Sequence, residues 1–325
     1  MPLPPLPPRP PMTQPPPTDL AASVTVLALG QFDGVHRGHA QVFASAVREA
    51  GRRGGLSAAL TFEPRVDVVL ARPGVPVPGR LTTPAETTAR ILQVGIRHVA
   101  VWPFDHALAA KSPVDFLQLL RRAFPALQCV VAGEDFTFGA CGAGHAGNFQ
   151  ELATLADPRR PLDGRFVPAV VDRFGQKVSS TAIREALLAG KPLRATELLG
   201  RPYALAGRVV HGRQVGRTRG LPTANLQIPT DLLLPRPGVY AADALLPDGE
   251  CRPAGTFVAD ARDALQALYQ SPIEAHLPGF SGDLYGIPLT LRFRRYLRPF
   301  RPFASEAEAI HSIRHDLARL RAFRS

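Results

Sequence analysis

The spacing of apolar and polar positions divides the chain into two regions with different periods. Between Val24 and Gly200, short apolar runs alternate with stretches in which apolar residues recur with a helical period. Apolar runs of about four to eight residues are typical of buried strands, and the longer period is typical of helices. The first region therefore predicts an α/β fold, with strands at 24–29, 58–62, 98–102 and 129–132.

Capping residues mark the helices between these strands. Thr83 and Glu86 form a capping box around Pro84 at the first helical position, which is a typical helix start. Because strands and helices alternate at this spacing, we expect a parallel sheet with helices on both faces. The helices are expected at 39–50, 84–94, 113–122 and 181–189.

After Gly200 the helical period is largely lost. Leu289, Leu291 and Phe293 alternate with polar side chains, which is the period of a half-buried strand. Short strands separated by Gly and Pro predict a small β-barrel, and a capping box at Ser305 predicts one C-terminal helix. The barrel strands are expected at 205–210, 224–228, 239–245, 273–277 and 289–293.

Length and composition support this division. The chain has 325 residues, which corresponds to two domains of about 150 residues each. Its N-terminus is rich in proline, so residues 1–20 are expected to form a disordered, polyproline-like tail. We place the α/β domain at 21–195 and the barrel domain at 196–325.

Charge and cysteine content narrow the class of protein. The net charge of +11 suggests a nucleic-acid partner, but nearly all of the basic residues are arginine and none form a basic tail. We therefore expect no nucleic-acid partner. The 3 cysteines form neither a disulfide framework nor a zinc motif, which favours the cytoplasm. No apolar run is long enough to span a membrane or to act as a secretory signal.

A candidate phosphate site lies where the first strand ends and a helix begins. Residues 30–39 are Gly-Gln-Phe-Asp-Gly-Val-His-Arg-Gly-His, and the free amides and dipole of a helix start favour an anion. His36 and His39 are spaced to donate to phosphate oxygens from one pocket. Two other interpretations stay open: histidines that merely cap the helix, and a zinc pair that lacks a third ligand. Close backbone approach is permitted by Gly30, Gly34 and Gly38.

A second anion site is predicted about 140 residues later. Ser180 and Thr181 place hydroxyls at a helix start, and Arg184 follows one turn into the helix. This combination suits the far phosphates of a nucleoside triphosphate. A P-loop is excluded, because the chain contains no GxxxxGK[ST] motif.

A third motif lies in the barrel region. A Gly-rich stretch that contains Gly207, Gly212 and Arg217 leads into Pro-Thr-Ala-Asn. Thr223 and Asn225 are two residues apart, so both oxygen ligands lie on one face of a strand, and such ligands suit Mg²⁺ bound to nucleotide phosphates. A chance turn explains this short motif about equally well on its own.

The motifs of the first region resemble the adenylyltransferase half of the prokaryotic bifunctional riboflavin kinase/FAD synthetases. That half is a Rossmann-like domain of the HxGH nucleotidyltransferase superfamily. The resemblance implies that His36 and His39 bind the ATP phosphates and stabilise the transition state while the FMN phosphate attacks the α-phosphorus. The matching segments are 30–39, 61–64, 81–83, 133–139 and 179–187.

The same resemblance assigns the other residues of this half. Ser180, Thr181 and Arg184 would hold the β- and γ-phosphates that leave as pyrophosphate. The strand-end residues Gly30, Phe32, Gly34 and Gly38 would contact ATP. The flavin pocket would be lined by Phe62, Asp135, Phe136 and Phe138.

The second region resembles the riboflavin kinase module, a β-barrel with a C-terminal helix. This resemblance implies that Glu274 is the general base for the ribityl hydroxyl and that Thr223 and Asn225 hold Mg²⁺ and ATP. Gly207, Gly212 and Arg217 would bind ATP phosphates. The matching segments are 207–212, 222–226, 237–240, 274–276 and 283–286.

The expected function is phosphorylation of riboflavin to FMN, followed by adenylylation of FMN to FAD with release of pyrophosphate. Riboflavin, FMN and ATP are then the small-molecule partners and Mg²⁺ the cofactor, while self-association is left open. Some segments depart from the family pattern: Arg65-Val66 stands where His-Pro is common, and 255–263 replaces an Asn-x-Gly-x-x-Pro-Thr-Phe segment. The alternative is therefore an FMN adenylyltransferase with an impaired or inactive kinase domain.

Overall fold

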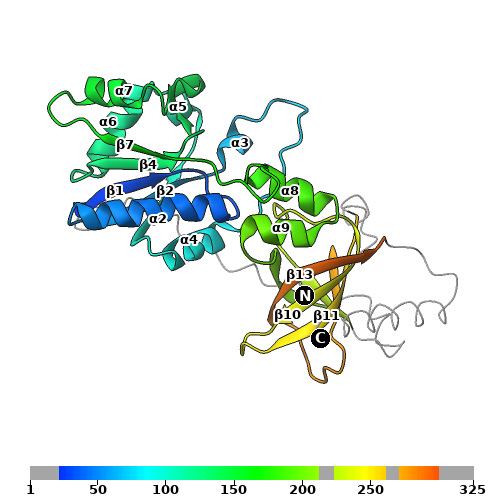
Figure 1. The fold of residues 1–325 in the computed structure, drawn as a ribbon. Helices are drawn as coiled ribbons and strands as arrows, with labels where there is room; N and C mark the ends of the chain where they lie inside the picture. Colours follow the sequence, from blue (N-terminus) through cyan, green and yellow to red (C-terminus); the bar gives the residue numbers. More distant parts are fainter. Residues whose placement is uncertain (1–21, 212–222, 261–270, 300–325) are drawn as a thin grey trace, which may run out of the picture. The chain divides into compact units, whose positions relative to one another are not determined.

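A computed structural model describes residues 22–211, 223–260 and 271–299 and divides into two compact units (Figure 1). The units are Met1–Ser179 and Ser180–Ser325. The boundary between the two domains, which the sequence analysis places near residue 195, stays a prediction. The Pro-rich tail, Gly212, Arg217 and the helix predicted from Ser305 lie outside the described residues.

The first unit is built on a five-stranded parallel sheet in the order β3-β2-β1-β4-β7. This order places β1 and β4 side by side, so their carboxyl ends meet at one edge of the sheet. A small antiparallel pair, β5 and β6, follows β4. The strands are β1 (Val24–Leu29), β2 (Leu56–Glu63), β3 (His98–Pro103), β4 (Cys129–Gly133), β5 (Thr137–Phe138), β6 (Gly144–His145) and β7 (Asp163–Val167).

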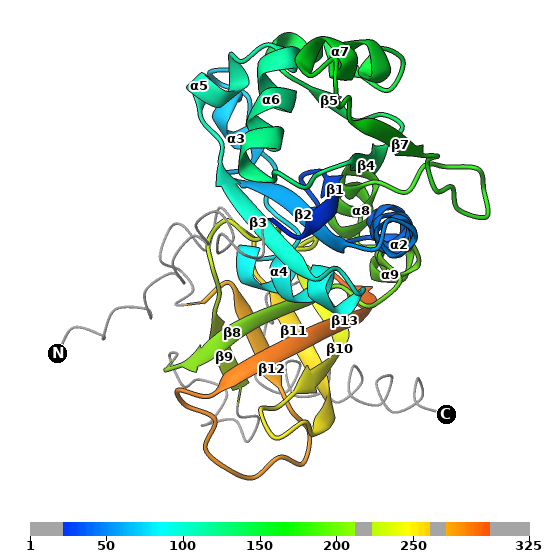
Figure 2. The ribbon, with the colours of Figure 1, turned by 90° about the vertical axis from the view of Figure 1, so that its left-hand side faces the viewer.

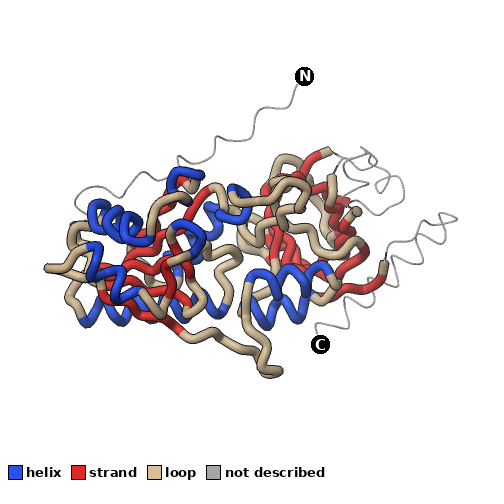
Figure 3. Tube along the Cα trace, turned by 90° about the horizontal axis from the view of Figure 1, so that it is seen from above, coloured by secondary structure: helices blue, strands red, loops and turns tan. Residues whose placement is uncertain are grey.

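Helices cover both faces of this sheet, and Figure 3 shows them on either side of its strands. Successive residues of β1 point to opposite faces, so Leu27 packs under α6 and α7 whereas Ala28 packs under α2 and α4. Each face thus has its own apolar core. The helices are α2 (Arg37–Arg52), α3 (Val66–Val69), α4 (Pro84–Gln93), α5 (His106–Ala109), α6 (Pro113–Ala123), α7 (Phe149–Ala156) and the 3-10 turn η1 (Ala140–Gly142).

In the part of the second unit that the structure describes, a closed six-stranded barrel is accompanied by two short helices (Figure 2). Tyr240 and Phe293 are fully buried in it and meet edge to face at 5.2 Å. The helices α8 (Ser180–Leu188) and α9 (Pro192–Leu199) pack on each other, and α9 packs on the last strand. The strands are β8 (Ala204–Val210), β9 (Thr223–Gln227), β10 (Gly238–Leu245), β11 (Cys251–Val258), β12 (Ile273–His276) and β13 (Pro288–Arg298).

The structure confirms the predicted fold class and each strand predicted from the sequence, with ends that shift by a few residues. Strand β7 was missed because it lies at the sheet edge, where its residues are only partly buried. Strand β11 was missed because Pro253 and Gly255 are unfavourable in strands. Helix α9 was missed because Gly190 was taken as the end of the helical part of this region, whereas a second helix begins at Pro192.

One half-buried histidine predicts how the stability of the first unit depends on pH. The Nε2 atom of His98, at the start of β3, is buried without a hydrogen-bond partner, and burial lowers the pKa of this imidazole. The unfolded chain therefore takes up a proton near pH 6.5 that the folded chain does not. Stability is full above that pH and falls as the pH drops towards the lowered folded pKa.

Chemical unfolding at pH 8, 7, 6 and 5 (about one unit apart, across the ordinary histidine pKa) measures this dependence. The wild-type chain should lose free energy of unfolding towards pH 5, and His98→Gln, which cannot titrate, should lose less. Parallel slopes for the two proteins would contradict this role of His98.

Candidate active sites

The first candidate site is the turn that joins β1 to α2. His36 is the N-cap residue of α2. Its Nδ1 atom accepts a hydrogen bond from the backbone N–H of His39 at 3.3 Å, and Nδ1 of His39 accepts one from the backbone N–H of His36 at 3.4 Å. Two backbone amides at the helix start are satisfied in this way. The HxGH spacing is therefore itself a capping signal.

These two hydrogen bonds also determine the chemistry of both rings. A ring nitrogen that accepts a hydrogen bond carries no proton, so the neutral imidazoles of His36 and His39 are assigned as Nε2–H tautomers. The rings stack with their centroids 3.5 Å apart. The pair thus combines two Nε2–H donors with the N-terminus of a 16-residue helix, where a phosphate oxygen is favoured.

Close packing holds the rings in place. A Cβ atom on Gly38 would lie 3.1 Å from the ring of His36, so this position needs glycine if the ring is to keep its place. Phe32 is 2% exposed and meets the ring of His39 edge to face at 5.3 Å. Gly30 is equally constrained, because a Cβ there would lie 2.7 Å from the Phe32 ring. The ATP contact predicted for Phe32 stays a prediction, since its side chain packs inside the unit.

Asp33 fastens this turn to the segment before α4, although sequence reasoning gave it no role. Its carboxylate accepts hydrogen bonds from the backbone N–H of Leu81 at 2.9 Å and of Thr82 at 3.3 Å. In return the backbone N–H of Gly34 donates to Thr82 Oγ1 at 3.0 Å. An acidic residue directly before a Gly-x-His sequence is the signal that could have identified it.

Asp135 stands beyond the carboxyl end of β4 and forms an ion pair with Lys177 at 2.5 Å. The hydrogen bond from Lys177 lowers the pKa of the Asp135 carboxyl. Asp135 therefore stays ionised near the histidine pair. Asp135 was predicted from the sequence, and the structure shows that Lys177 is its ion-pair partner. This partner could not be predicted because the two residues lie in segments that are distant in the sequence.

The three predicted flavin-pocket phenylalanines have different surroundings. Phe138 is buried and packs on the rings of Phe116 and Phe149, and Phe136 is half-buried and stacks on Phe138 at 6.0 Å. Phe62 is also buried, but it borders a small hollow at the ends of β1 and β2. This hollow is lined by Gln31, Thr61, Phe62, Glu63, Arg65, Arg80, Pro84, Thr87 and Val101.

The predicted triphosphate residues lie on α8 in the second unit. Ser180 is the first residue of α8, Thr181 is exposed, and Arg184 is half-buried one turn later. The opposite side of the helix is apolar and includes the fully buried Ile183. The hydroxyls therefore do stand at a helix start, and their contact with phosphate stays a prediction.

The second candidate site lies on neighbouring barrel strands. Glu274 of β12 pairs directly with Asn225 of β9, and His276 pairs with Thr223. Residues between them, such as Ala275, are fully buried, whereas Glu274 is partly exposed, so the four polar residues share the other strand face. The register brings together the three residues that the sequence predicted. It also adds His276, which follows Glu274 by two positions.

Burial makes the Glu274 carboxyl a weaker acid than an ordinary glutamate. Removal from water penalises its charged form and raises the pKa of the carboxyl above its usual value. A carboxylate in this state is a stronger proton acceptor than one on the surface.

At the end of β8, the exposed His211 stacks on Tyr285 at 3.7 Å. Gly207 also lies in β8, where a Cβ would meet the Gln227 carbonyl oxygen at 2.5 Å.

Two further observations concern metals and membranes. In residues 22–211, 223–260 and 271–299, no three His, Cys, Asp or Glu side chains are grouped as a metal site. Within the same ranges, no helix combines the length and the apolar character that crossing a bilayer requires.

The fold and the first site define a class. A parallel sheet whose first strand leads through a His-x-Gly-His turn into a helix is the architecture of a nucleotide-binding nucleotidyltransferase domain, here followed by a barrel. The FAD synthetase family matches residues 19–182, and the riboflavin kinase family matches residues 199–324. The chain belongs to the family of proteins that join these two domains.

Relatives with the same two domains are similar along most of their length. The bifunctional riboflavin kinase/FMN adenylyltransferase of Listeria monocytogenes is 33% identical over 92% of this chain and 92% of its own length. The protein of the same name from Escherichia coli strain K12 is 33% identical, again over 92% of each chain.

A solved structure has the same fold. It is described as a macrolide-efflux protein from Streptococcus pneumoniae, is 28% identical and has a TM-score of 0.79. The match covers 92% of this chain and 94% of that one. The likeness therefore extends over both units.

The capping pair can be tested by substitution of two glycines in the same helix. Gly38→Ala puts a methyl group against the His36 ring, whereas Gly51→Ala puts one into open space. Imidazole ¹⁵N spectra should show Nε2–H tautomers for His36 and His39 in the wild-type chain and in Gly51→Ala. In Gly38→Ala the His36 signals should move. Unchanged His36 signals in Gly38→Ala would contradict the described packing.

Proposed function

We propose that this chain phosphorylates riboflavin to FMN with ATP in its barrel unit and adenylylates FMN to FAD in its α/β unit. The observation that carries the proposal is the reciprocal capping of His36 and His39 at the N-terminus of α2, which prepares two donors for phosphate oxygens. It is supported by the match of both families along the chain and by the names of the relatives.

In adenylyl transfer, a phosphate oxygen of FMN forms a bond to the α-phosphorus of ATP, and the bond from that phosphorus to the pyrophosphate oxygen breaks. Charge grows on the α-phosphate oxygens in the transition state. The Nε2–H groups of His36 and His39 would donate to these oxygens, and the α2 dipole would add a favourable field. Ser180, Thr181 and Arg184 would hold the β- and γ-phosphates until pyrophosphate leaves.

The FMN phosphate needs no strong base to attack, because it is already ionised near neutral pH. Positioning and electrostatics are then the main contributions of the protein. Asp135, kept ionised by Lys177, lies near the histidine pair and would favour a positive charge or a donor on the substrate. We assign Phe62, which borders the hollow, to the flavin pocket together with Phe136 and Phe138.

In riboflavin phosphorylation, Glu274 would take the proton from the ribityl 5′-hydroxyl as its oxygen bonds to the γ-phosphorus of ATP. The bond to the ADP oxygen breaks in the same step. A half-buried glutamate suits this task because its raised pKa makes it a better base. His276 lies across from Thr223 on the same face and would contact the phosphate end of the nucleotide.

Magnesium fits the second site by the chemistry of its donors. Thr223 and Asn225 supply a hydroxyl and an amide oxygen beside the Glu274 carboxylate, and hard oxygen ligands are those that Mg²⁺ prefers. The ion would neutralise phosphate charge during transfer. Gly207, Gly212 and Arg217 would contact the nucleotide phosphates. Location in the cytoplasm and the absence of nucleic-acid binding stay predictions, and self-association is left open.

An FMN adenylyltransferase with an impaired kinase is the competing proposal, and it rests on one region. Gly255, Thr256 and Phe257 stand where the family has a different segment, and Phe257 pairs with Glu274 across β11 and β12. Thr256 Oγ1 is buried without a hydrogen-bond partner. An unusual neighbour therefore adjoins the base, and only an activity measurement separates the two proposals.

Reciprocal substitutions test the proposed function. His36→Ala should reduce FAD formation from FMN by on the order of a hundredfold or more and leave riboflavin phosphorylation intact, because it removes a transition-state donor. Glu274→Gln should do the reverse. The measurement is separation of riboflavin, FMN and FAD by chromatography after incubation with ATP and Mg²⁺. Wild-type chain that makes FAD from FMN but no FMN from riboflavin would support the competing proposal.

The raised pKa of Glu274 predicts an asymmetric pH dependence. The base must be ionised to act, so riboflavin phosphorylation should fall as the pH drops through the raised pKa of this carboxyl, above the value of 4.5 for an ordinary glutamate. The acid limb of kcat/KM for riboflavin in the wild-type chain provides the measurement. A limb at or below 4.5 would show that Glu274 is not the base.

A further inference from the structure

The turn that carries His36 has a backbone that needs outside support. Phe32 has φ 51°, Gly34 has φ 82° and Val35 has φ 41°. The left-handed region is unfavourable for residues other than glycine, and most of all for a β-branched residue such as valine. Such a conformation persists only where the surrounding structure holds it.

Asp33, between the strained residues, provides that support. Its carboxylate accepts two backbone hydrogen bonds from the segment before α4, and Gly34 donates one back to Thr82. The hydroxyl of Thr82 lies 2.8 Å from that of Thr87 in α4. These hydrogen bonds between Asp33, Gly34 and the Leu81–Thr82 segment hold the turn against the start of α4, and we call them the clasp. The clasp depends on the buried carboxylate of Asp33.

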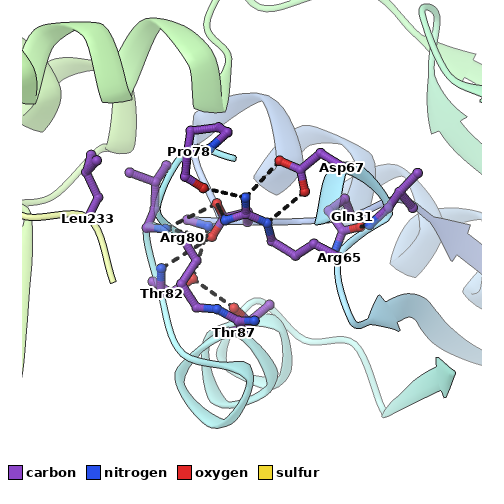
Figure 4. A network of polar contacts seen from close by, with 12 residues as sticks. Gln31, Arg65, Asp67, Pro78, Arg80, Thr82, Thr87 and Leu233 are labelled. Atoms are coloured by element: carbon purple, nitrogen blue, oxygen red, sulfur yellow. Dashed lines mark hydrogen bonds and ion pairs between the residues drawn. The ribbon is translucent and has the colours of Figure 1, made fainter. Parts of the chain in front are cut away.

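Arg65 is a buried countercharge of that carboxylate. Its Nη1 lies 3.6 Å from Asp33 Oδ2, and the two side chains are 5% and 6% exposed. The same guanidinium donates to both oxygens of Asp67 at 2.9 and 2.8 Å and to the carbonyl oxygen of Pro78 at 2.6 Å. Figure 4 shows Arg65 between Asp67 and Pro78. Arg65 thus joins the end of β2, α3 and the segment before α4 to the turn.

We propose that Arg65 is a positioning residue for adenylyl transfer, which holds the strained His36 turn in place through Asp33. The proposal rests on the proposed function of the first site. Removal of the positive charge beside a buried carboxylate is strongly unfavourable, so loss of Arg65 would weaken the hydrogen bonds that Asp33 makes to the segment before α4. The turn would then relax, and the Nε2–H donor of His36 would move away from the position it holds at the helix start.

A direct contact between Arg65 and substrate is the other reading, because Arg65 borders the hollow beside Phe62. The geometry favours positioning. Nε and Nη2 of Arg65 are used by Asp67 and Pro78, and Nη1 faces Asp33. The two roles give different kinetics: loss of a substrate contact raises KM, whereas displacement of His36 lowers kcat.

The experiment compares Arg65→Met and Arg65→Lys with a matched control in the full-length chain. Arg53→Met removes a similar guanidinium, which pairs with Glu49 and Asp163 near the amino ends of β4 and β7, the opposite sheet edge. Arg65→Met should lower kcat for FMN adenylylation by about a hundredfold, with KM for FMN and ATP changed by less than about threefold. Arg65→Lys should recover part of the loss, and Arg53→Met should keep kcat within about threefold.

Coupling between the two residues is the second measurement. If Arg65 acts through Asp33, the double variant Asp33→Asn/Arg65→Met should lose no more kcat than the more damaged single variant. Losses that multiply, a rise in KM with unchanged kcat, or an equal loss in Arg53→Met would each overturn the proposal.

Two controls separate this proposal from the proposed function. Riboflavin phosphorylation by the same variants reports on the other unit and should stay unchanged. Hydrogen exchange of the Leu81 and Thr82 amides reports on the clasp without any activity, and it should speed up in Arg65→Met but not in Arg53→Met. Wild-type chain that makes no FAD would refute the proposed function, while unchanged exchange would refute the positioning role.

Discussion

The first site depends on one reciprocal pair of hydrogen bonds. His36 and His39 each accept from the backbone amide of the other, so the bonds that start α2 also decide which ring nitrogen carries the proton. Each capping bond stabilises the helix by about 1 kcal/mol, and neither ring can turn without the loss of one. Orientation of the two imidazole rings is therefore a consequence of helix initiation. Phe32 and Gly38 then leave the rings little room to move.

The two sites tune their carboxyl groups in opposite directions. Asp135 is exposed and lies against Lys177, so its pKa is lowered and it stays charged. Glu274 lies in the barrel wall, where burial is the cause that raises its pKa. A charged group near the histidine pair suits adenylyl transfer, which needs an oriented substrate and a favourable electrostatic field rather than a base. A group that readily accepts a proton suits a transfer whose nucleophile is a hydroxyl.

The sequence identified what is local and missed what depends on distant segments. The strand end at Leu29, the HxGH helix start and the strand pair that carries Asn225 and Glu274 each have a signal within a few residues. The partners of these groups do not. Lys177 and Asp135 are 42 positions apart in the sequence, and no residue pattern near either of them predicts their contact. Arg65 was noted only as a departure from a family pattern, because its burial appears only once β2, α3 and the segment before α4 are packed.

Closure of the barrel explains how the residues of the second site are held in a defined arrangement although they lie far apart in the sequence. Side chains alternate between the two faces of a strand, so a one-residue slip of β12 against β9 would replace Glu274 by Ala275 on the outer face. Such a slip would also turn the glutamate inward against the buried Leu226 and Ala224 of β9. The large cost of an inward carboxylate selects one register. Since every strand of a closed barrel has two partners, that register is enforced from both sides, and Glu274 is held opposite Asn225.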